Sequence, residues 1–84
     1  MHSIEVTDTF GGEANYSWVR RGTTERSARR GLIAAAKELA GWRCRVRVED
    51  AGDMLTIRPV STAGLCQVAF VTWIDDVEVQ HGSQ

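Results

Sequence analysis

Hydrophobic and polar residues alternate at the start of the chain and again in its middle. Ile4 and Val6 enclose the polar Glu5, which is the period of a strand with one buried face. Residues 42–48 alternate over their whole length, with one apolar side and one basic side. The inward positions are Trp42, Cys44, Val46 and Val48, and the outward positions are Arg43, Arg45 and Arg47.

A hairpin is expected after the first strand, because Gly11-Gly12 accommodates the positive φ angles of a tight turn. Tyr16 and Trp18 share one face of the returning strand. A three-residue loop would place Val6 opposite Trp18 and form a large apolar cross-strand pair, whereas a two-residue loop would place Glu5 there. We predict the three-residue loop.

A helix is expected between the two strand regions. Thr23 or Thr24 can cap its N-terminus, and Gly41 can end it in the left-handed conformation. Gly31 lies within this helix, where we expect it to allow close approach to the sheet. The apolar stripe that would face the sheet consists of Ala28, Leu32, Ala35 and Leu39, widened by Ile33, Ala36 and Ala40.

Further strands are expected toward the C-terminus. Residues 54–60 are expected to form the hairpin partner of residues 42–48. Because Pro59 has no backbone N–H to donate, we expect this strand to end at Pro59 or to lie at an edge of the sheet. After a turn at 61–64, residues 65–74 are almost continuously apolar, which predicts a central strand buried on most of both faces. Residues 77–79 could add a short edge strand.

These elements predict an α+β fold in one domain that spans residues 1–84. Its single-layer sheet, antiparallel or mixed, carries one helix on one face, in the chain order β-β-α-β-β-β. A chain of 84 residues and 9.3 kDa has room for one thin core. No apolar run reaches the length that spans a bilayer, and no signal peptide is evident, so we expect no membrane partner and a cytoplasmic location.

The sequence contains no catalytic motif, and we expect no enzymatic activity, metal site or cofactor. Cys44 and Cys66 lack the spacing of a metal site, and the histidines at positions 2 and 81 lie at opposite ends of the chain. The acidic cluster of residues 75–78 is typical of a solvated turn. The Gly11-Gly12 pair is not followed by a phosphate-loop pattern.

Charge is unevenly distributed along a chain whose net charge is −1. Residues 20–47 contain eight Arg and one Lys against two Glu, whereas the segments on either side are acidic. Arginine suits bidentate contact with carboxylate or phosphate. The partner-binding candidates are Arg43, Arg45 and Arg47 on the strand, with Arg20, Arg21 and Arg30 nearby. Alternatively, these arginines only solvate a sheet face or pair with neighbouring acids.

Three stretches resemble a family of small uncharacterised proteins of tailed phages and prophages: GGEANYSWVRR (Gly11–Arg21), GDMLTIRP (Gly52–Pro59) and GLCQVAFVTW (Gly64–Trp73). The resemblance implies an accessory protein of a mobile element in a bacterial host cell. It carries no functional residues across. Size and this context are similar to those of anti-CRISPR proteins.

The first functional hypothesis is an inhibitor that binds an acidic surface of a host protein complex and blocks it sterically. The second is a small nucleic-acid-binding regulator that uses the same arginines; it ranks lower because the pI of about 6.1 is far from the basic values typical of such domains. The third is a structural phage component that self-associates through a sheet edge. The sequence does not define the oligomeric state.

Overall fold

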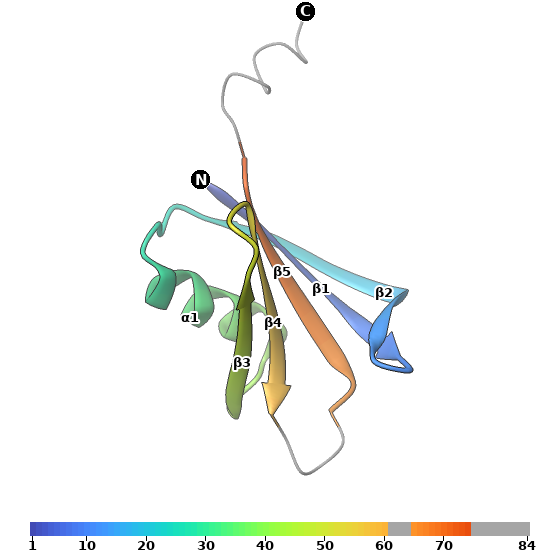
Figure 1. Cartoon of the computed structure of the whole chain (residues 1–84). Coiled ribbons are helices and arrows are strands. Elements are labelled where there is room, and N and C mark those ends of the chain that lie inside the picture. Colours follow the sequence, from blue (N-terminus) through green and yellow to red (C-terminus); the bar gives the residue numbers. More distant parts are fainter. Residues whose placement is uncertain (61–64, 75–84) are drawn as a thin grey trace, which may run out of the picture.

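The computed structural model describes residues 1–60 and 65–74. Within these residues the chain forms a five-stranded antiparallel sheet with one helix against it (Figure 1). The prediction of an α+β domain is therefore confirmed. In chain order the elements are β1 (His2–Phe10), β2 (Glu13–Thr24), α1 (Arg29–Ala40), β3 (Arg45–Asp50), β4 (Met54–Val60) and β5 (Gln67–Trp73).

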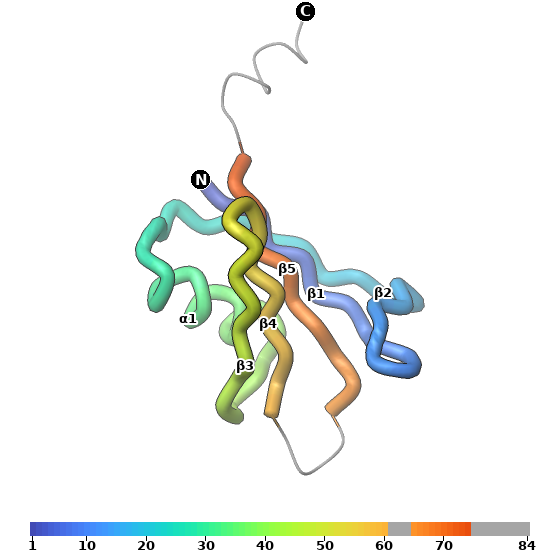
Figure 2. Tube along the Cα trace, in the orientation of Figure 1, coloured from blue at the N-terminus to red at the C-terminus, as the bar shows by residue number. Residues whose placement is uncertain are grey.

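The strand order across the sheet is β2-β1-β5-β4-β3. β1 and β5 lie side by side, so the first strand of the chain pairs with the last one described, from His2↔Trp73 to Asp8↔Gln67. β2 and β3 form the two edges. The twist of the sheet turns the β1–β2 hairpin away from the direction of β3 and β4, as the trace in Figure 2 shows. The helix covers one face of the sheet, and the described part of the chain places no helix on the other face.

The core lies between α1 and the face of the sheet that it covers. The periodicity of β1 is confirmed, because Ile4 and Val6 are buried there. β5 is the central strand of the sheet, as expected, and Val68, Ala69 and Val71 in its middle are inaccessible. It is shorter than the predicted strand at 65–74, because it runs from Gln67 to Trp73, and Leu65 and Trp73 are exposed. The buried cluster comprises Ile4, Val6, Leu32, Ala35, Ala36, Trp42, Leu55, Ile57, Ala69 and Val71.

The strand predicted at residues 42–48 begins three positions later, at Arg45, and continues to Asp50. The difference arises because Trp42 still belongs to the end of the helix: its backbone N–H donates to the Lys37 carbonyl at 3.0 Å. Its indole is buried and donates from Nε1 to Oε1 of Gln67 at 2.6 Å. The inward side of the strand was predicted correctly, since Val46 and Val48 pack against the core.

The predicted threonine cap of the helix is wrong. β2 continues to Thr24, which pairs with His2, so neither threonine is available as a cap. The helix begins at Arg29 instead, after Ala28, and no side chain caps it. Its other end is as predicted, because Gly41 adopts the left-handed conformation at φ 78° and its N–H donates to the Lys37 carbonyl.

Gly31 does not bring the helix close to the sheet. A Cβ atom at this position would meet the side chain of Arg26, at 3.3 Å. The close approach occurs from the strand side, at Gly22 of β2, where a Cβ would lie 3.1 Å from Cδ2 of Leu39. The absence of a side chain at Gly22 therefore lets the end of α1 lie against β2.

The predicted hairpin register is also wrong. Gly11-Gly12 forms a two-residue turn between Phe10 and Glu13, and Val6 lies opposite Arg20 rather than Trp18. A bulge in β2 causes the difference, because the regular pairing is interrupted between Thr7 and Thr9 of β1.

The pairing of β4 with β5 ends at Ile57↔Ala69, before Pro59 is reached. β4 nevertheless continues to Val60 and pairs with β3 there, through Val46↔Pro59 and Arg45↔Val60, so the prediction that the strand ends at Pro59 or is an edge strand is wrong. Pro59, whose nitrogen has no hydrogen to donate, lies beyond the last residue pair between β4 and β5. The turn predicted at 61–64, the edge strand predicted at 77–79 and the acidic cluster at 75–78 lie outside the described residues.

Candidate functional site

The face of the sheet away from α1, which we call the open face, is partly covered by the β1–β2 hairpin. Thr7 and Val68 point to this face and are fully buried, although no helix of residues 1–60 and 65–74 lies there. Arg58 of β4 donates from a guanidinium N–H to the Gly12 carbonyl at 2.9 Å. Because β5 and β1 separate β4 from β2 in the sheet, this bond requires the hairpin turn to fold over the open face.

The bulge that bends the hairpin is held by the carboxylate of Asp8. This carboxylate accepts hydrogen bonds from the backbone N–H of Ser17 at 2.9 Å and from its hydroxyl at 2.6 Å. It also accepts one from the side-chain amide of Asn15 at 2.9 Å. Tyr16, between these residues, has a positive φ of 58°. That conformation is uncommon for a residue with a side chain, and here three hydrogen bonds to one carboxylate stabilise it.

The buried hydroxyl of Thr7 is satisfied by the same bulge. It accepts a hydrogen bond from the backbone N–H of Tyr16 at 2.9 Å and lies 3.0 Å from the carbonyl of Trp18, to which it can donate. This pairing removes the cost of burying a polar group beneath the hairpin. Thr7 and Asp8, adjacent on β1, thus determine where the alternation of β2 is broken.

These hydrogen bonds hold the pKa of the Asp8 carboxyl far below its ordinary value of 3.8. The Ser17 hydroxyl contributes most, followed by the Asn15 amide. Both bonds are made to the ionised form, which they therefore favour over the protonated form. The carboxylate consequently remains charged in the folded protein at pH values where a free aspartate would be protonated.

We predict that the free energy of unfolding falls as the pH is lowered through the acid range because of Asp8. The folded pKa is the lower one, so this contribution is fully present above the unfolded value of 3.8 and is lost as the pH approaches the folded value. Urea unfolding at a series of pH values measures it. Asp8→Asn should be less stable at neutral pH. Its side-chain NH2 would replace one carboxylate oxygen, and an NH2 group cannot accept the hydrogen bonds that Ser17 and Asn15 donate to Asp8.

The Asn variant should also lose this part of the acid dependence. Asp53→Asn, which removes an exposed carboxylate at the far turn between β3 and β4, is the matched control and should retain it. Equal pH profiles for Asp8→Asn and the wild type would contradict the assigned role of Asp8.

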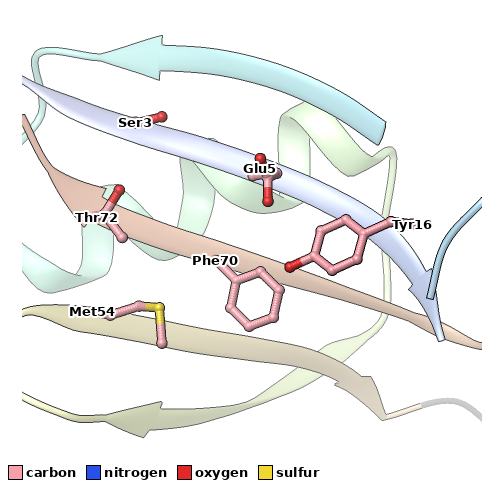
Figure 3. Close-up of a pocket in the computed structure, with 6 residues that line it drawn as sticks. All are labelled: Ser3, Glu5, Tyr16, Met54, Phe70 and Thr72. Atoms are coloured by element: carbon pink, nitrogen blue, oxygen red, sulfur yellow. The ribbon is translucent and has the colours of Figure 1, made fainter. Parts of the chain in front are cut away.

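A cavity of about 300 Å³ lies on the open face beside the folded hairpin. Its floor comes from three adjacent strands, because Ser3 of β1, Thr72 of β5 and Met54 of β4 are neighbours in register. Glu5 and Phe70 form the next row of paired residues. Tyr16 reaches the cavity from the bulge, with its hydroxyl end toward Phe70, as Figure 3 shows.

Two of the six arginines predicted as partner-binding residues lie together on the open face. Arg45 and Arg47 alternate with the inward valines of β3 and are exposed at the edge of the sheet. Arg47 lies directly opposite Arg58 of β4, a pairing of like charges that is unfavourable in an antiparallel sheet. Neither Arg45 nor Arg47 makes an ion pair or side-chain hydrogen bond with another residue in the described part of the chain.

The other four arginines are elsewhere. Arg21 is on the open face but at the opposite edge, where its Nε lies 3.1 Å from a carboxylate oxygen of Glu5. Arg20 points to the helix side and donates to the Leu39 carbonyl at 3.0 Å, at the end of α1. The remaining two belong to the helix layer: Arg30 is on α1, and Arg43 borders a hollow formed by the C-terminal half of α1.

Sequence reasoning missed three residues of the open face. Arg58 lies next to Pro59 in a strand that was interpreted only as a hairpin partner, and Phe70 is in a strand predicted to be buried on most of both faces. Tyr16 was placed on the same side as Trp18, whereas it faces the cavity and Trp18 lies within 5.9 Å of the Arg20 guanidinium. The positive φ of Tyr16 reverses the alternation, and no local sequence signal marks it.

Within the described ranges, no helix is long and apolar enough to cross a membrane. The same residues contain no cluster of three or more His, Cys, Asp or Glu side chains that could hold a metal ion. No protein-family model, curated protein or solved structure matches the chain.

Proposed function

We propose that this chain is a non-catalytic binding protein that occupies an acidic surface of a partner protein complex with its open face. The observation that carries the proposal is the exposure of Arg45 and Arg47, side by side on an edge strand and without an acidic partner in the described structure. Arginine is enriched at protein interfaces and pairs in a planar manner with carboxylates.

The arrangement on β3 and β4 supports a role in binding over a role in stability. Two arginines directly across a strand pair repel each other, so Arg47 and Arg58 are an unfavourable choice for the isolated sheet. Arg58 is compensated by the Gly12 carbonyl, whereas Arg47 has no such bond to any residue that the structure describes. A carboxylate of a bound partner beside Arg47 would relieve this repulsion, so binding and local charge balance would be coupled.

The resemblance of Gly11–Arg21 and the two later stretches to small phage proteins suggests a mobile-element protein that acts in the cytoplasm of a bacterial host. A rigid sheet of this size that blocks a host defence complex stoichiometrically, as an anti-CRISPR protein does, fits that setting. Inhibition would be steric, because the proposal assigns no reaction to the chain.

Affinity capture from bacterial lysate, with and without nuclease, tests the proposal. We expect a stoichiometric protein complex that survives nuclease treatment, identified by mass spectrometry. Recovery of nucleic acid alone, or loss of all captured protein after nuclease, would contradict protein binding as the main function.

A nucleic-acid-binding regulator is the second candidate, and one observation favours it. Tyr16 and Phe70 lie on the same face as Arg45 and Arg47, and aromatic rings beside arginines are the components of a platform for single-stranded nucleic acid. This candidate requires an affinity that decreases steeply with salt, because neutralising phosphates releases counterions. If the chain does not bind single-stranded oligonucleotides even at low salt, this candidate is excluded.

A further inference from the structure

The cavity beside Tyr16 combines a carboxylate with aromatic and thioether groups. Glu5 borders it on β1, Phe70 and Thr72 on β5, and Met54 on β4 (Figure 3). The volume of about 300 Å³ is at the small end of the range for ligand sites. A site of this size suits one small chemical group.

Glu5 is the one acidic side chain among the described residues that line the cavity, and no basic side chain lines it. Its side chain is 30% exposed, so its charge is partly shielded from water and is directed toward a nearby cation. The rings of Tyr16 and Phe70 present electron-rich faces that also attract cations. An anion would be repelled by Glu5, and a purely apolar group would gain no attraction from that carboxylate.

Glu5 already pairs with one cation, which comes from outside the cavity. The Nε of Arg21 contacts Oε2 of Glu5 at 3.1 Å, from the outer edge of the sheet. The side chain of Arg21 is 71% exposed, and an ion pair of such exposure contributes little stability. Arg21 can therefore be displaced from Glu5 at small cost, and a competing cation that also contacts the two rings gains interactions that Arg21 lacks.

We propose that this cavity binds a small organic ammonium group, through the Glu5 carboxylate and the rings of Tyr16 and Phe70. A lysine side chain of a partner and a free methylated amine share this chemistry. The site is separate from Arg45 and Arg47, which lie on β3 at the far edge of the sheet. It can therefore be tested in the isolated chain, and its failure would leave the proposed function untouched.

The test is an NMR titration of the isotopically labelled full chain with three probes. Choline supplies a quaternary ammonium, Nα-acetyl-lysinamide supplies a primary one, and dimethylbutanol is the neutral carbon analogue of choline. We expect saturable shifts of the amides of Phe70 and Thr72 with the cations and weaker binding of the neutral analogue. Tighter binding of Nα-acetyl-lysinamide would indicate that a lysine side chain is the better occupant, and tighter binding of choline would indicate a methylated amine.

Variants connect the binding to the named groups. Glu5→Gln keeps the shape and removes the charge, and we expect it to bind choline about fivefold more weakly. Phe70→Leu removes one ring and should weaken binding about two- to fivefold. Arg21→Gln removes the guanidinium that competes for Glu5 and should therefore strengthen the binding of choline. If the ion pair had only a structural role, this substitution would not be expected to strengthen binding.

Glu49→Gln is the matched control, because it removes a carboxylate from the same strand face at the β3 edge and leaves the cavity intact. It should bind choline as the wild type does. Dispersed amide spectra establish that each variant is folded. Equal binding of choline and dimethylbutanol, unchanged binding by Glu5→Gln, or no saturable shift with either cation would overturn the proposal.

Discussion

The double variant Arg45→Glu/Arg47→Glu should lose all measurable binding to the partner captured by the wild type. Both side chains are exposed on an edge strand, so the fold does not depend on them. After the charge reversal, glutamates would face the acidic surface of the partner, and such a contact between like charges costs several kcal/mol of binding free energy. A loss of this size is enough to abolish binding of micromolar affinity. Binding is measured by calorimetry or surface plasmon resonance with the purified partner, and circular dichroism checks the fold.

The matched control is Arg30→Glu/Arg43→Glu, which changes the net charge by the same amount on the helix side of the molecule. This variant should retain most of the affinity. Equal losses in both double variants would mean that only the overall charge matters, and full binding by Arg45→Glu/Arg47→Glu would remove the open face from the mechanism.

The largest effect on stability is expected from Ile57→Ala. Ile57, on β4, is completely buried in the core cluster that also contains Leu32 and Ala36 of α1, and truncating such a residue costs about 2–5 kcal/mol through lost burial and the cavity left behind. Folded domains are stable by only roughly 5–15 kcal/mol, so a chain of this size should become marginal. Urea unfolding followed by tryptophan fluorescence measures the difference.

Val60→Ala, at the exposed end of the same strand, is the corresponding control and should change the unfolding free energy by less than about 0.5 kcal/mol. If Ile57→Ala were no more costly than Val60→Ala, the assignment of Ile57 to the buried core would be incorrect.

The sequence predicts the elements whose periodicity is simple. The alternation around Ile4 and Val6, and the apolar run that became β5, indicated their strands because their burial repeats over several residues. Gly41 likewise ended the helix where a left-handed residue is favoured. In each case the conformation or burial that the local pattern favours is the one that the residue has in the folded chain.

The hairpin could not be predicted in this way, because its register depends on side chains that meet only in the folded chain. Asp8 and Thr7 bond to residues 15–18 of the facing strand and stabilise a bulge that loop-length rules do not anticipate. The bulge moves Tyr16 onto the open face and lets Arg58 reach Gly12. The cavity is therefore a consequence of tertiary contacts, and no sequence motif marks the residues that line it.

The arginines show the same limit. Their concentration between residues 20 and 47 suggested one binding surface, but strand order separates them: β2 and β3 are opposite edges of the sheet. Arg20 is used to cap the carbonyl end of α1, and Arg21 pairs with Glu5. Only Arg45 and Arg47 combine exposure, adjacency and the absence of a described acidic partner.

The central claim is that the open face is the surface that meets the partner. Hydroxyl-radical footprinting of the wild-type complex tests it directly, since oxidisable residues lie on both sides of the molecule. Tyr16 and Met54 border the open-face cavity, whereas Trp18 lies beside Arg20 on the helix side. We predict that partner binding protects Tyr16 and Met54 and leaves Trp18 as reactive as in the free chain. Protection of Trp18 with unchanged oxidation of Tyr16 and Met54 would contradict the account.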